Sequence, residues 1–474
     1  MTPEEFRHAG HELIDWIADY RTNLEQRPVR AQVEPGNIRR SFPASAPEAP
    51  LAPEQLLREL EQRVLPGITL VQHPMHYGWF PSNAALASVL GDIASSGLGA
   101  LGISWESCPS LTEVEEVVCD WMRQLTGLSE NWEGCIHDTA STSCLTSLLL
   151  ARERASNYAQ NRGGLQGADK PLVIYTTAEA HSSVVKAALL AGIGSDNLRM
   201  VAMDPESHSM QAESLAEQVV TDIANGYLPV AVVASVGSTS VTAFDPVAEI
   251  AEITAGYDIW LHVDAAMAGS AMLLPECRHL WEGVEAADSI SWNPHKWMGT
   301  ILDCSLMYVR DVQHLVRVMS TNPSYLRSNV DDEVRQYRDW GIPLGRRFRA
   351  LKLWYHLGID GIESIRTRLR RDLENARWFA ETVAATEDWH VLAPVKLQTV
   401  CIRHEPPGIE GEALDRHTLA WVNAINQSGV AFMSPSMLDD RWMVRVSIGV
   451  EATTREHVEK LWSLIRQTVN ESAL

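Results

Sequence analysis

Lys296 is the residue whose chemistry stands out along the chain. Only six of the 474 residues are lysine, and this one lies between Trp292 and Trp297 in the largely apolar stretch SISWNPHKWMG. Loss of water around an ammonium group lowers its pKa, and the neutral amine can attack a carbonyl to form an imine. The alternative is a lysine at a strand end whose ammonium group reaches solvent. The stretch therefore predicts either an imine-forming lysine or an ordinary surface one.

Asp264 ends the apolar stretch IWLHVDAA. A carboxylate buried at a strand end costs free energy unless a cation meets it. A protonated pyridine nitrogen is such a cation, and the pair would make the ring an effective acceptor of electrons. The alternative is an aspartate that caps the following turn. Lys296 lies about thirty residues downstream on the next predicted strand, which favours the first interpretation.

Two further segments could complete a site for a flat, phosphorylated ring. The run Thr139–Ser143 comes before the helical stretch CLTSLLLARERA, and a helix N-terminus supplies N–H donors for a phosphate. His181 lies in the loop before SSVVKAALL, where an imidazole could stack on a ring and handle protons. The alternatives are a Ser/Thr N-cap without a ligand and a structural, hydrogen-bonded histidine.

Strand-like and helical stretches alternate between about residues 80 and 310, and this alternation positions the candidate residues. It predicts a mostly parallel α/β sheet covered by helices on both faces. Ligands of such sheets bind beyond the carboxyl ends of the strands. We therefore expect one edge to collect residues 138–141, His181, Ser238, Thr239, Asp264 and residues 293–296.

The two ends of the chain differ from this central part. Phe6, Leu13, Ile14 and Ile17 fall on one face of an N-terminal helix, which packs either on the protein's own core or on a partner subunit. A proline-rich linker over residues 34–54 separates it from a second predicted helix. After a charged helix over 361–386, strands and helices alternate and predict a small α+β domain.

Charge and cysteine usage exclude several classes of protein. A net charge of −22 and a pI of about 5.1 give no basic patch for nucleic acid or an anionic membrane. The seven cysteines form no C-x-x-C pair, which predicts reduced thiols in a cytoplasm. The acidic N-terminus is unlike a signal peptide, and no stretch has the ~18–20 apolar residues that span a bilayer.

Two motifs are false leads. His73 and His76 flank a proline and lack a matching third ligand, so we expect no metal. Residues 97–102 spell G-x-G-x-x-G, but they follow a helical stretch rather than a strand, which argues against a dinucleotide site.

The stretches HVDAAMAGSA, SWNPHKW, AEAHSSVVKA and IPLGRRFRALKLW together resemble the group II pyridoxal-phosphate decarboxylases, the aromatic-L-amino-acid decarboxylase family. The resemblance runs over nearly the whole chain. It implies the fold-type-I architecture of pyridoxal-phosphate (PLP)-dependent transferases and an obligate homodimer that exchanges N-terminal helices. It also implies three parts: an N-terminal helical segment on the partner subunit (1–80), a large PLP-binding domain (81–358) and a small C-terminal domain (359–474).

The resemblance assigns roles to the candidate residues. Lys296 matches the imine lysine, Asp264 the partner of the pyridine nitrogen and His181 the histidine that stacks on the ring. Ala266 would pack on the opposite ring face, and Thr239 would hydrogen-bond near the ring and His181. The positions that match phosphate-binding residues are Thr139, Ala140, Ser141, Asn293 and His295.

The implied reaction is decarboxylation of an aromatic L-amino acid (tryptophan, phenylalanine, tyrosine or dihydroxyphenylalanine) to its amine and carbon dioxide. Tyr325 matches a loop tyrosine that protonates the substrate carbon; members with phenylalanine there tend towards aldehyde-forming oxidative deamination. The alternatives are that aldehyde-forming reaction, or decarboxylation of histidine or a non-aromatic amino acid. A non-catalytic scaffold would be expected to lack Lys296, Asp264 or Tyr325, and an aminotransferase would not combine NPHKW with a loop tyrosine.

The segment HPMHYGWFPSN matches the family's pocket wall. Ile103 and Met267 stand where relatives carry aromatic residues, so a larger ring such as indole could fit. The pocket segments contain no arginine or lysine, which argues against glutamate. The candidate substrate contacts are Trp79, Phe80, Pro81, Ser82 and Ile103.

Overall fold

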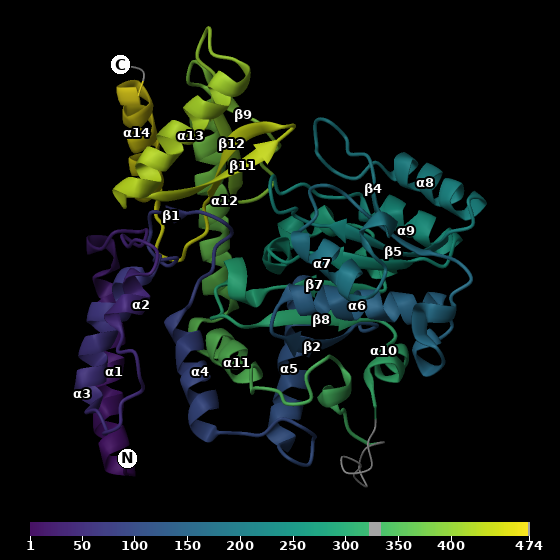
Figure 1. The fold of residues 1–474 in the computed structure, drawn as a ribbon, viewed down its shortest axis with the longest axis horizontal. Helices are drawn as coiled ribbons and strands as arrows, with labels where there is room; N and C mark the ends of the chain where they lie inside the picture. Colours follow the sequence, from purple (N-terminus) through teal and green to yellow (C-terminus); the bar gives the residue numbers. More distant parts are fainter. Residues whose placement is uncertain (322–332, 473–474) are drawn as a thin grey trace. The chain divides into compact units, whose positions relative to one another are not determined.

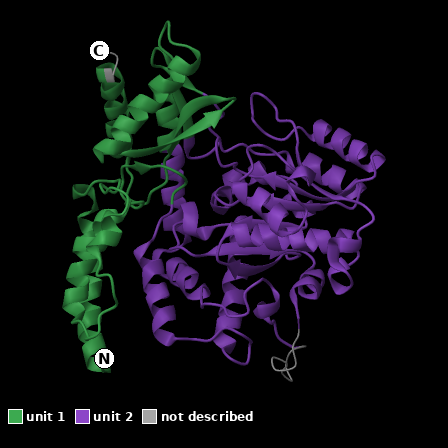
Figure 2. Cartoon of the chain, in the orientation of Figure 1, with its two compact units in different colours: residues 1–81, 375–391, 400–474 green, residues 82–374, 392–399 purple. Residues whose placement is uncertain are grey.

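The computed structural model describes residues 1–321 and 333–472. The chain divides into two compact units, shown in Figure 2. Unit 1 comprises residues 1–81, 375–391 and 400–474, and unit 2 comprises residues 82–374 and 392–399. Unit 1 thus joins the N-terminal segment with much of the C-terminal part. The three-part division expected from the sequence, with its partner subunit, stays a prediction.

A mostly parallel sheet forms the centre of unit 2, as predicted (Figure 1). In the described residues its seven strands have the order β2-β8-β7-β6-β5-β3-β4. Strand β8 runs antiparallel to both β2 and β7, so these two neighbours are parallel to each other and to β6, β5, β3 and β4. The strands are β2 (Glu133–His137), β3 (Leu172–Thr176), β4 (Leu198–Met200), β5 (Leu228–Ser235), β6 (Trp260–Asp264), β7 (Ser289–Trp292) and β8 (Ser305–Val309).

Helices cover this sheet, and its central strands are buried on both faces. Every residue of β3, β6, β7 and β8 is buried. Helix α6 packs across β5 to β8, and α8 and α9 pack on β5. The helices of unit 2 are α4 (Leu86–Leu98), α5 (Pro109–Thr126), α6 (Ala140–Ala155), α7 (Ser182–Leu190), α8 (Ala212–Ala224), α9 (Val247–Gly256), α10 (Val312–Met319), α11 (Ala350–Asp360) and the first part of α12 (Ile362–Ala384).

Unit 1 carries the smaller α+β arrangement predicted for the C-terminal region. Its described strands form a five-stranded sheet of order β1-β11-β12-β10-β9, with α13 packed on β11 and β12. The strands are β1 (His76–Tyr77), β9 (Trp389–Val391), β10 (Thr399–His404), β11 (Phe432–Leu438) and β12 (Arg441–Ser447). The helices are α1 (Pro3–Thr22), α2 (Asn37–Ser41), α3 (Pro53–Glu59), the second part of α12, α13 (Gly411–Ser428) and α14 (Arg455–Ser472).

The N-terminal helix α1 begins with a capping box, in which Thr2 and Glu5 satisfy each other's backbone N–H groups. None of its residues is buried in the described chain. The apolar side chains of Phe6, Leu13 and Ile14 are 65%, 43% and 40% exposed. The predicted amphipathic stripe is therefore largely uncovered. No helix of the described residues has the length and apolar character needed to cross a membrane.

Candidate active site

The Lys296 turn follows the buried strand β7. Trp292 and Trp297 are fully buried on either side of Lys296, which is itself half-buried. The Trp297 indole N–H donates to Oδ2 of the buried Asp372 across 3.0 Å. At Lys296 the backbone leaves helical geometry, with φ −98° and ψ −117°. Two buried tryptophans, of which Trp297 is hydrogen-bonded, thus flank the short segment that carries the lysine.

Asp264 is the last residue of β6 and is 8% exposed. Its Oδ1 accepts the backbone N–H of Ala266 at 3.0 Å, and the Ala266 carbonyl accepts the N–H of Asn293 at 2.9 Å. These bonds tie the carboxyl end of β6 to that of β7. The carboxylate and the lysine turn therefore share one edge of the sheet.

His181 joins Asp264 and Lys296 at this edge. It is the N-cap of α7, and its Nδ1 accepts the backbone N–H of Ser183 at 3.1 Å. Partial burial lowers the pKa of His181, the Asp264 carboxylate raises it and the Lys296 ammonium lowers it. The ring still has solvent-exposed surface. A neutral imidazole thus lies within electrostatic range of both groups and offers a face on which a flat ring could stack.

The start of α6 and the residues after β7 form a candidate phosphate site. Thr139 is the N-cap of the 16-residue helix α6, whose first turn contains Ala140 and Ser141. Residues 140–143, which were expected to precede the helix, thus belong to its first turn. Since β2 is parallel to β7, this helix start lies at the same sheet edge as Lys296.

Asn293 and His295 extend that candidate site. Oδ1 of Asn293 is buried without a hydrogen-bond partner among the described residues, but an amide oxygen only accepts, so the amide NH2 is the group of Asn293 that could bind a phosphate. Nδ1 of His295 accepts the backbone N–H of Cys304 at 2.9 Å, and burial lowers the pKa of His295 to about 4. The N–H donors of a helix start, an aspartate and a lysine fit a phosphorylated pyridine aldehyde.

Other predicted site residues have less decisive positions. Ala266 and Thr239 are half-buried after β6 and β5, which is the same edge of the sheet, and their roles stay predictions. Ser82 and Ile103 are half-buried in unit 2. Tyr325 lies outside the described residues.

Trp79, Phe80 and Pro81 belong to unit 1, and their role as substrate contacts stays a prediction. Trp79 is 52% exposed and has a φ of 51°, a conformation that is strained for a bulky side chain. Its ring centroid lies 5.0 Å from that of Phe432, and its backbone N–H donates to the Ser434 hydroxyl at 2.7 Å. Neighbouring contacts thus hold an exposed aromatic ring in an unfavourable backbone conformation.

Sequence reasoning missed His262, a fully buried residue two positions before Asp264 on β6. Its Nδ1 lies 2.9 Å from the Ser289 hydroxyl of β7. Side chains two residues apart on a strand share a face. A histidine inside an apolar strand, on the same face as a catalytic candidate, is the signal that could have identified it.

Comparisons with known proteins identify the family of the chain. Residues 35–405 match the pyridoxal-dependent decarboxylase conserved domain. Tryptophan decarboxylase 2 of Oryza sativa subsp. japonica is 36% identical over 475 residues, covering 98% of this chain and 95% of the relative. Phenylacetaldehyde synthase of Arabidopsis thaliana is 37% identical over 476 residues, covering 98% and 96%.

A solved structure extends the likeness to the whole fold. The crystal structure of Oryza sativa TDC with PLP and tryptamine superposes with a TM-score of 0.96 at 32% identity and covers 100% of this chain and 99% of that one. The fold is therefore that of the PLP-dependent decarboxylases, as predicted. The chain belongs to the pyridoxal-dependent decarboxylase family, and it is an enzyme that uses pyridoxal phosphate to decarboxylate an amino acid.

Proposed function

We propose that this enzyme removes the α-carboxylate of an aromatic L-amino acid at the sheet edge that carries Lys296, releasing the corresponding amine. The observation that carries the proposal is that His181, Asp264 and Lys296 lie at the carboxyl ends of the parallel strands β3, β6 and β7, at one edge of the sheet. Relatives named for tryptophan and tyrosine decarboxylation support the aromatic class. Tryptophan, phenylalanine, tyrosine and dihydroxyphenylalanine are the substrates to test first.

Pyridoxal phosphate, when bound, supplies an electron-accepting ring that takes up the electron pair of the broken Cα–carboxylate bond. In our proposal the Lys296 amine would hold the cofactor covalently and would give way to the amine of the substrate. Asp264 keeps the ring nitrogen protonated. The phosphate is held by Thr139, Ala140, Ser141, Asn293 and His295.

His181 and Ala266 hold the two faces of the ring in this proposal, and Thr239 hydrogen-bonds near His181. The cap bond to Ser183 occupies Nδ1, so the neutral His181 carries its proton on Nε2. Nε2 is then the atom that can donate a proton beside the substrate carbon. The family resemblance assigns the proton that reaches that carbon to Tyr325, with His181 assisting.

Trp79, Phe80, Pro81, Ser82 and Ile103 are proposed to contact the substrate side chain. The strained and exposed Trp79 supports this role, because such conformations cluster where ligands bind. Trp79→Asn, which tolerates the same φ, would raise KM for tryptophan more than it lowers kcat.

A direct experiment tests the reaction. Borohydride reduction of the enzyme with pyridoxal phosphate would link the cofactor to the peptide that contains Lys296, and mass spectrometry would locate it. Lys296→Ala would abolish both the linkage and carbon dioxide release, whereas Lys186→Ala, an exposed control on α7, would change neither. Formation of 2-oxo acids in place of amines would overturn the proposal in favour of transamination.

Aldehyde formation is the second candidate, because the relatives include a phenylacetaldehyde synthase of 37% identity. Ammonia, hydrogen peroxide and aldehyde would be measured beside the amine for each substrate. We expect amine to dominate in the wild type, and Tyr325→Phe to shift products towards aldehyde. Aldehyde as the main wild-type product would establish the second candidate instead.

We further propose that the chain acts as a homodimer with exchanged N-terminal helices. The exposed Phe6, Leu13 and Ile14 side chains of α1 support it, because an uncovered apolar stripe marks an interaction surface. Phe6→Glu with Leu13→Glu would yield monomers in light scattering, and an unchanged dimer mass would contradict the proposal. The seven free cysteines support a reducing compartment such as the cytoplasm.

A further inference from the structure

A row of buried side chains with polar groups leads along β6 and β7 to Asp264 inside unit 2. Trp260, His262 and Asp264 alternate along β6 and therefore point to one face of the sheet. In the register of the neighbouring strand β7, His262 faces Ser289 and Asp264 faces Ser291. Trp260 is 1% exposed, and His262, Ser289 and Ser291 are wholly buried. Polar groups at this depth need hydrogen-bond partners.

Hydrogen bonds connect this row from one end to the other. The Trp260 indole N–H lies 2.9 Å from the Ser289 hydroxyl and 3.0 Å from the Ser147 hydroxyl of α6, and the two hydroxyls are 2.8 Å apart. Ser289 also lies 2.9 Å from Nδ1 of His262. On the other side of the ring, Nε2 lies 3.4 Å from the Ser291 hydroxyl. The chain thus runs from the indole to the residue beside Asp264.

The Trp260 indole limits the possible directions of these hydrogen bonds. An indole N–H can only donate, so the Ser289 oxygen accepts from Trp260, and the Ser289 proton is available for Nδ1 of His262 or for the Ser147 oxygen. When Ser147 donates to Ser289 and Ser289 donates to Nδ1, the neutral His262 ring carries its proton on Nε2, facing Ser291. Burial lowers the pKa of His262 to about 4, while Asp264 raises it, so the ring is neutral at neutral pH.

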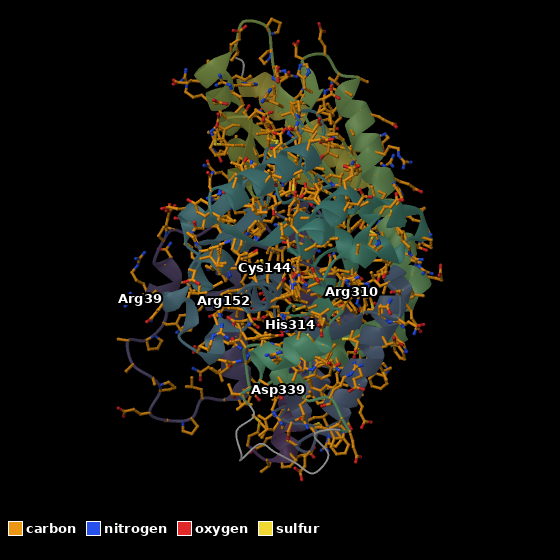
Figure 3. The ribbon with its side chains drawn as sticks, turned by 90° about the vertical axis from the view of Figure 1, so that its right-hand side faces the viewer. Arg39, Cys144, Arg152, Arg310, His314 and Asp339 are labelled. Carbon is orange, nitrogen blue, oxygen red and sulfur yellow. The ribbon has the colours of Figure 1, made fainter. Side chains whose placement is uncertain are left out.

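Other ionisable groups around Asp264 cannot replace this donor. The Cys144 thiol on α6, labelled in Figure 3, lies within electrostatic range of Asp264. Burial and Asp264 both raise the pKa of that thiol, so it stays protonated and is a weak donor. His181 is a second such group, and in the proposed site its Nε2 proton faces the substrate carbon, because Nδ1 accepts from Ser183.

We propose that His262 is a positioning residue, which acts through the Ser291 hydroxyl to hold the Asp264 carboxylate aimed at the ring nitrogen of the cofactor. This inference rests on the proposed role of Asp264. One oxygen of Asp264 is committed to the Ala266 N–H at 3.0 Å. The strand register places Ser291 opposite Asp264, and Nε2 of His262 lies 3.4 Å from the Ser291 hydroxyl. A hydroxyl whose oxygen accepts from Nε2 keeps its own proton for the neighbouring carboxylate, and this donor would orient that carboxylate.

The test reads the ring nitrogen rather than turnover alone. Wild type, His262→Leu, His262→Gln and Ser291→Ala would be reconstituted with pyridoxal phosphate labelled with nitrogen-15 at the ring. We expect the wild-type resonance to be that of a protonated nitrogen. His262→Leu and Ser291→Ala would move it towards the unprotonated position and weaken cofactor binding about tenfold to a hundredfold, the range for a hydrogen bond to a charged group. His262→Gln, whose amide N–H can replace Nε2–H, would restore both.

Two controls separate the possible outcomes. His314, labelled in Figure 3, is a buried histidine that hydrogen-bonds to Tyr158 and the Leu150 carbonyl, and its ring centroid lies 5.7 Å from that of Trp260. His314→Leu therefore changes the packing beside the row without removing a hydrogen bond of the row, and it should leave the ring nitrogen unchanged. Asp264→Asn should move the resonance strongly. If Asp264→Asn moves it while Ser291→Ala and a folded His262→Leu do not, His262 is only a packing residue and the inference fails. If Asp264→Asn also leaves it unmoved, the proposed site itself is wrong. Should His262→Leu not fold, Ser291→Ala alone decides.

Discussion

Nδ1 of His181 accepts the backbone N–H of Ser183 across 3.1 Å, and the Ser183 hydroxyl lies 2.7 Å from the same atom. The imidazole is therefore the N-cap of α7 and also lies at the sheet edge that carries Asp264 and Lys296. A capping side chain stabilises its helix by accepting an N–H that would otherwise have no partner. Because helix capping uses only Nδ1, mutation can separate the capping function of His181 from its proposed function in proton transfer.

His181→Asn should separate them. Asparagine is among the best N-cap residues, so the free energy of unfolding should stay within about 0.5 kcal/mol of the wild type. The ring and its Nε2 proton are lost, and kcat should fall by about 10²–10⁴-fold, the usual contribution of a positioned proton donor. His181→Ala should lose the same activity and about 1 kcal/mol more stability. Denaturant unfolding and carbon dioxide release measure the two effects. An Asn variant with wild-type kcat would refute the catalytic role.

Glu115 and Arg346 form a buried ion pair in unit 2. They are 1% and 7% exposed at the side chain, and a guanidinium nitrogen of Arg346 lies 2.5 Å from a Glu115 oxygen. Glu115 also accepts the backbone N–H of Ile136 at 2.7 Å, and Arg346 donates to the Ile136 carbonyl at 2.8 Å. The pair thus stabilises the end of β2, directly before the candidate phosphate site at the start of α6.

Arg346→Met should destabilise the enzyme by about 3–5 kcal/mol, because it leaves the buried Glu115 carboxylate without a cation. Adding Glu115→Gln to the same chain should recover a large part of that loss, since the uncompensated charge disappears. Urea unfolding of both variants measures this. Equal stability of the single and the double variant would show that the buried charge is not the cause.

The functional residues at the ends of strands were predictable from the sequence, but the hydrogen-bonded polar residues inside the strands were not. Asp264 and Lys296 each follow a short apolar run, and the parallel sheet brings such ends to one edge. His262 lies within an apolar strand, and only the register against β7 reveals its contacts with Ser289 and Ser291. Local periodicity contains no information on which strand becomes the neighbour.

Pairs far apart in the chain were equally hidden. Glu115 and Arg346 are 231 residues apart, and each alone resembles an ordinary charged residue of a helix or loop. The left-handed φ of Trp79 had no local signal either, because glycine and asparagine are the residues that usually mark it. Tertiary contacts with Phe432 and Ser434 override that preference.

Gly269, in the segment after β6, lies close to Trp292, the last residue of β7 before the turn that carries Lys296. A Cβ at this position would lie 2.3 Å from Cβ of Trp292, whereas a Cβ at Gly345 would meet nothing within 4 Å. Gly269→Ala should therefore push Trp292 and cost about 1–3 kcal/mol of stability, the usual range for overpacking a core. It should also weaken pyridoxal phosphate binding, because Trp292 precedes Asn293, a proposed phosphate ligand. Thermal unfolding and cofactor titration measure both effects, with Gly345→Ala as the neutral control. Wild-type behaviour of Gly269→Ala would show that the lysine turn can shift without loss.

Stability should fall as the pH drops from about 6.5 towards about 4, because burial lowers the pKa of several histidines. The pKa is about 4 for His76, His137, His262 and His295 and about 3 for His356. An unfolded histidine titrates near ~6.5, so between these values the unfolded chain binds more protons than the folded one. The free energy of unfolding then rises with pH, by up to roughly 1.4 kcal/mol per pH unit for each histidine.

Buried carboxyls oppose this trend. Burial raises the pKa of Asp245 to about 6 and also raises the pKa of Asp372, so their protonation favours the folded state as the pH falls. Five histidines outweigh these two carboxyls, and the net slope should stay positive. Urea unfolding of the apoenzyme between about pH 7 and about pH 5 measures the slope. His137→Gln should reduce it, because glutamine cannot take up the proton, whereas the exposed His8→Gln should leave it unchanged. An equal slope in His137→Gln and wild type would mean that His137 does not resist protonation in the folded state.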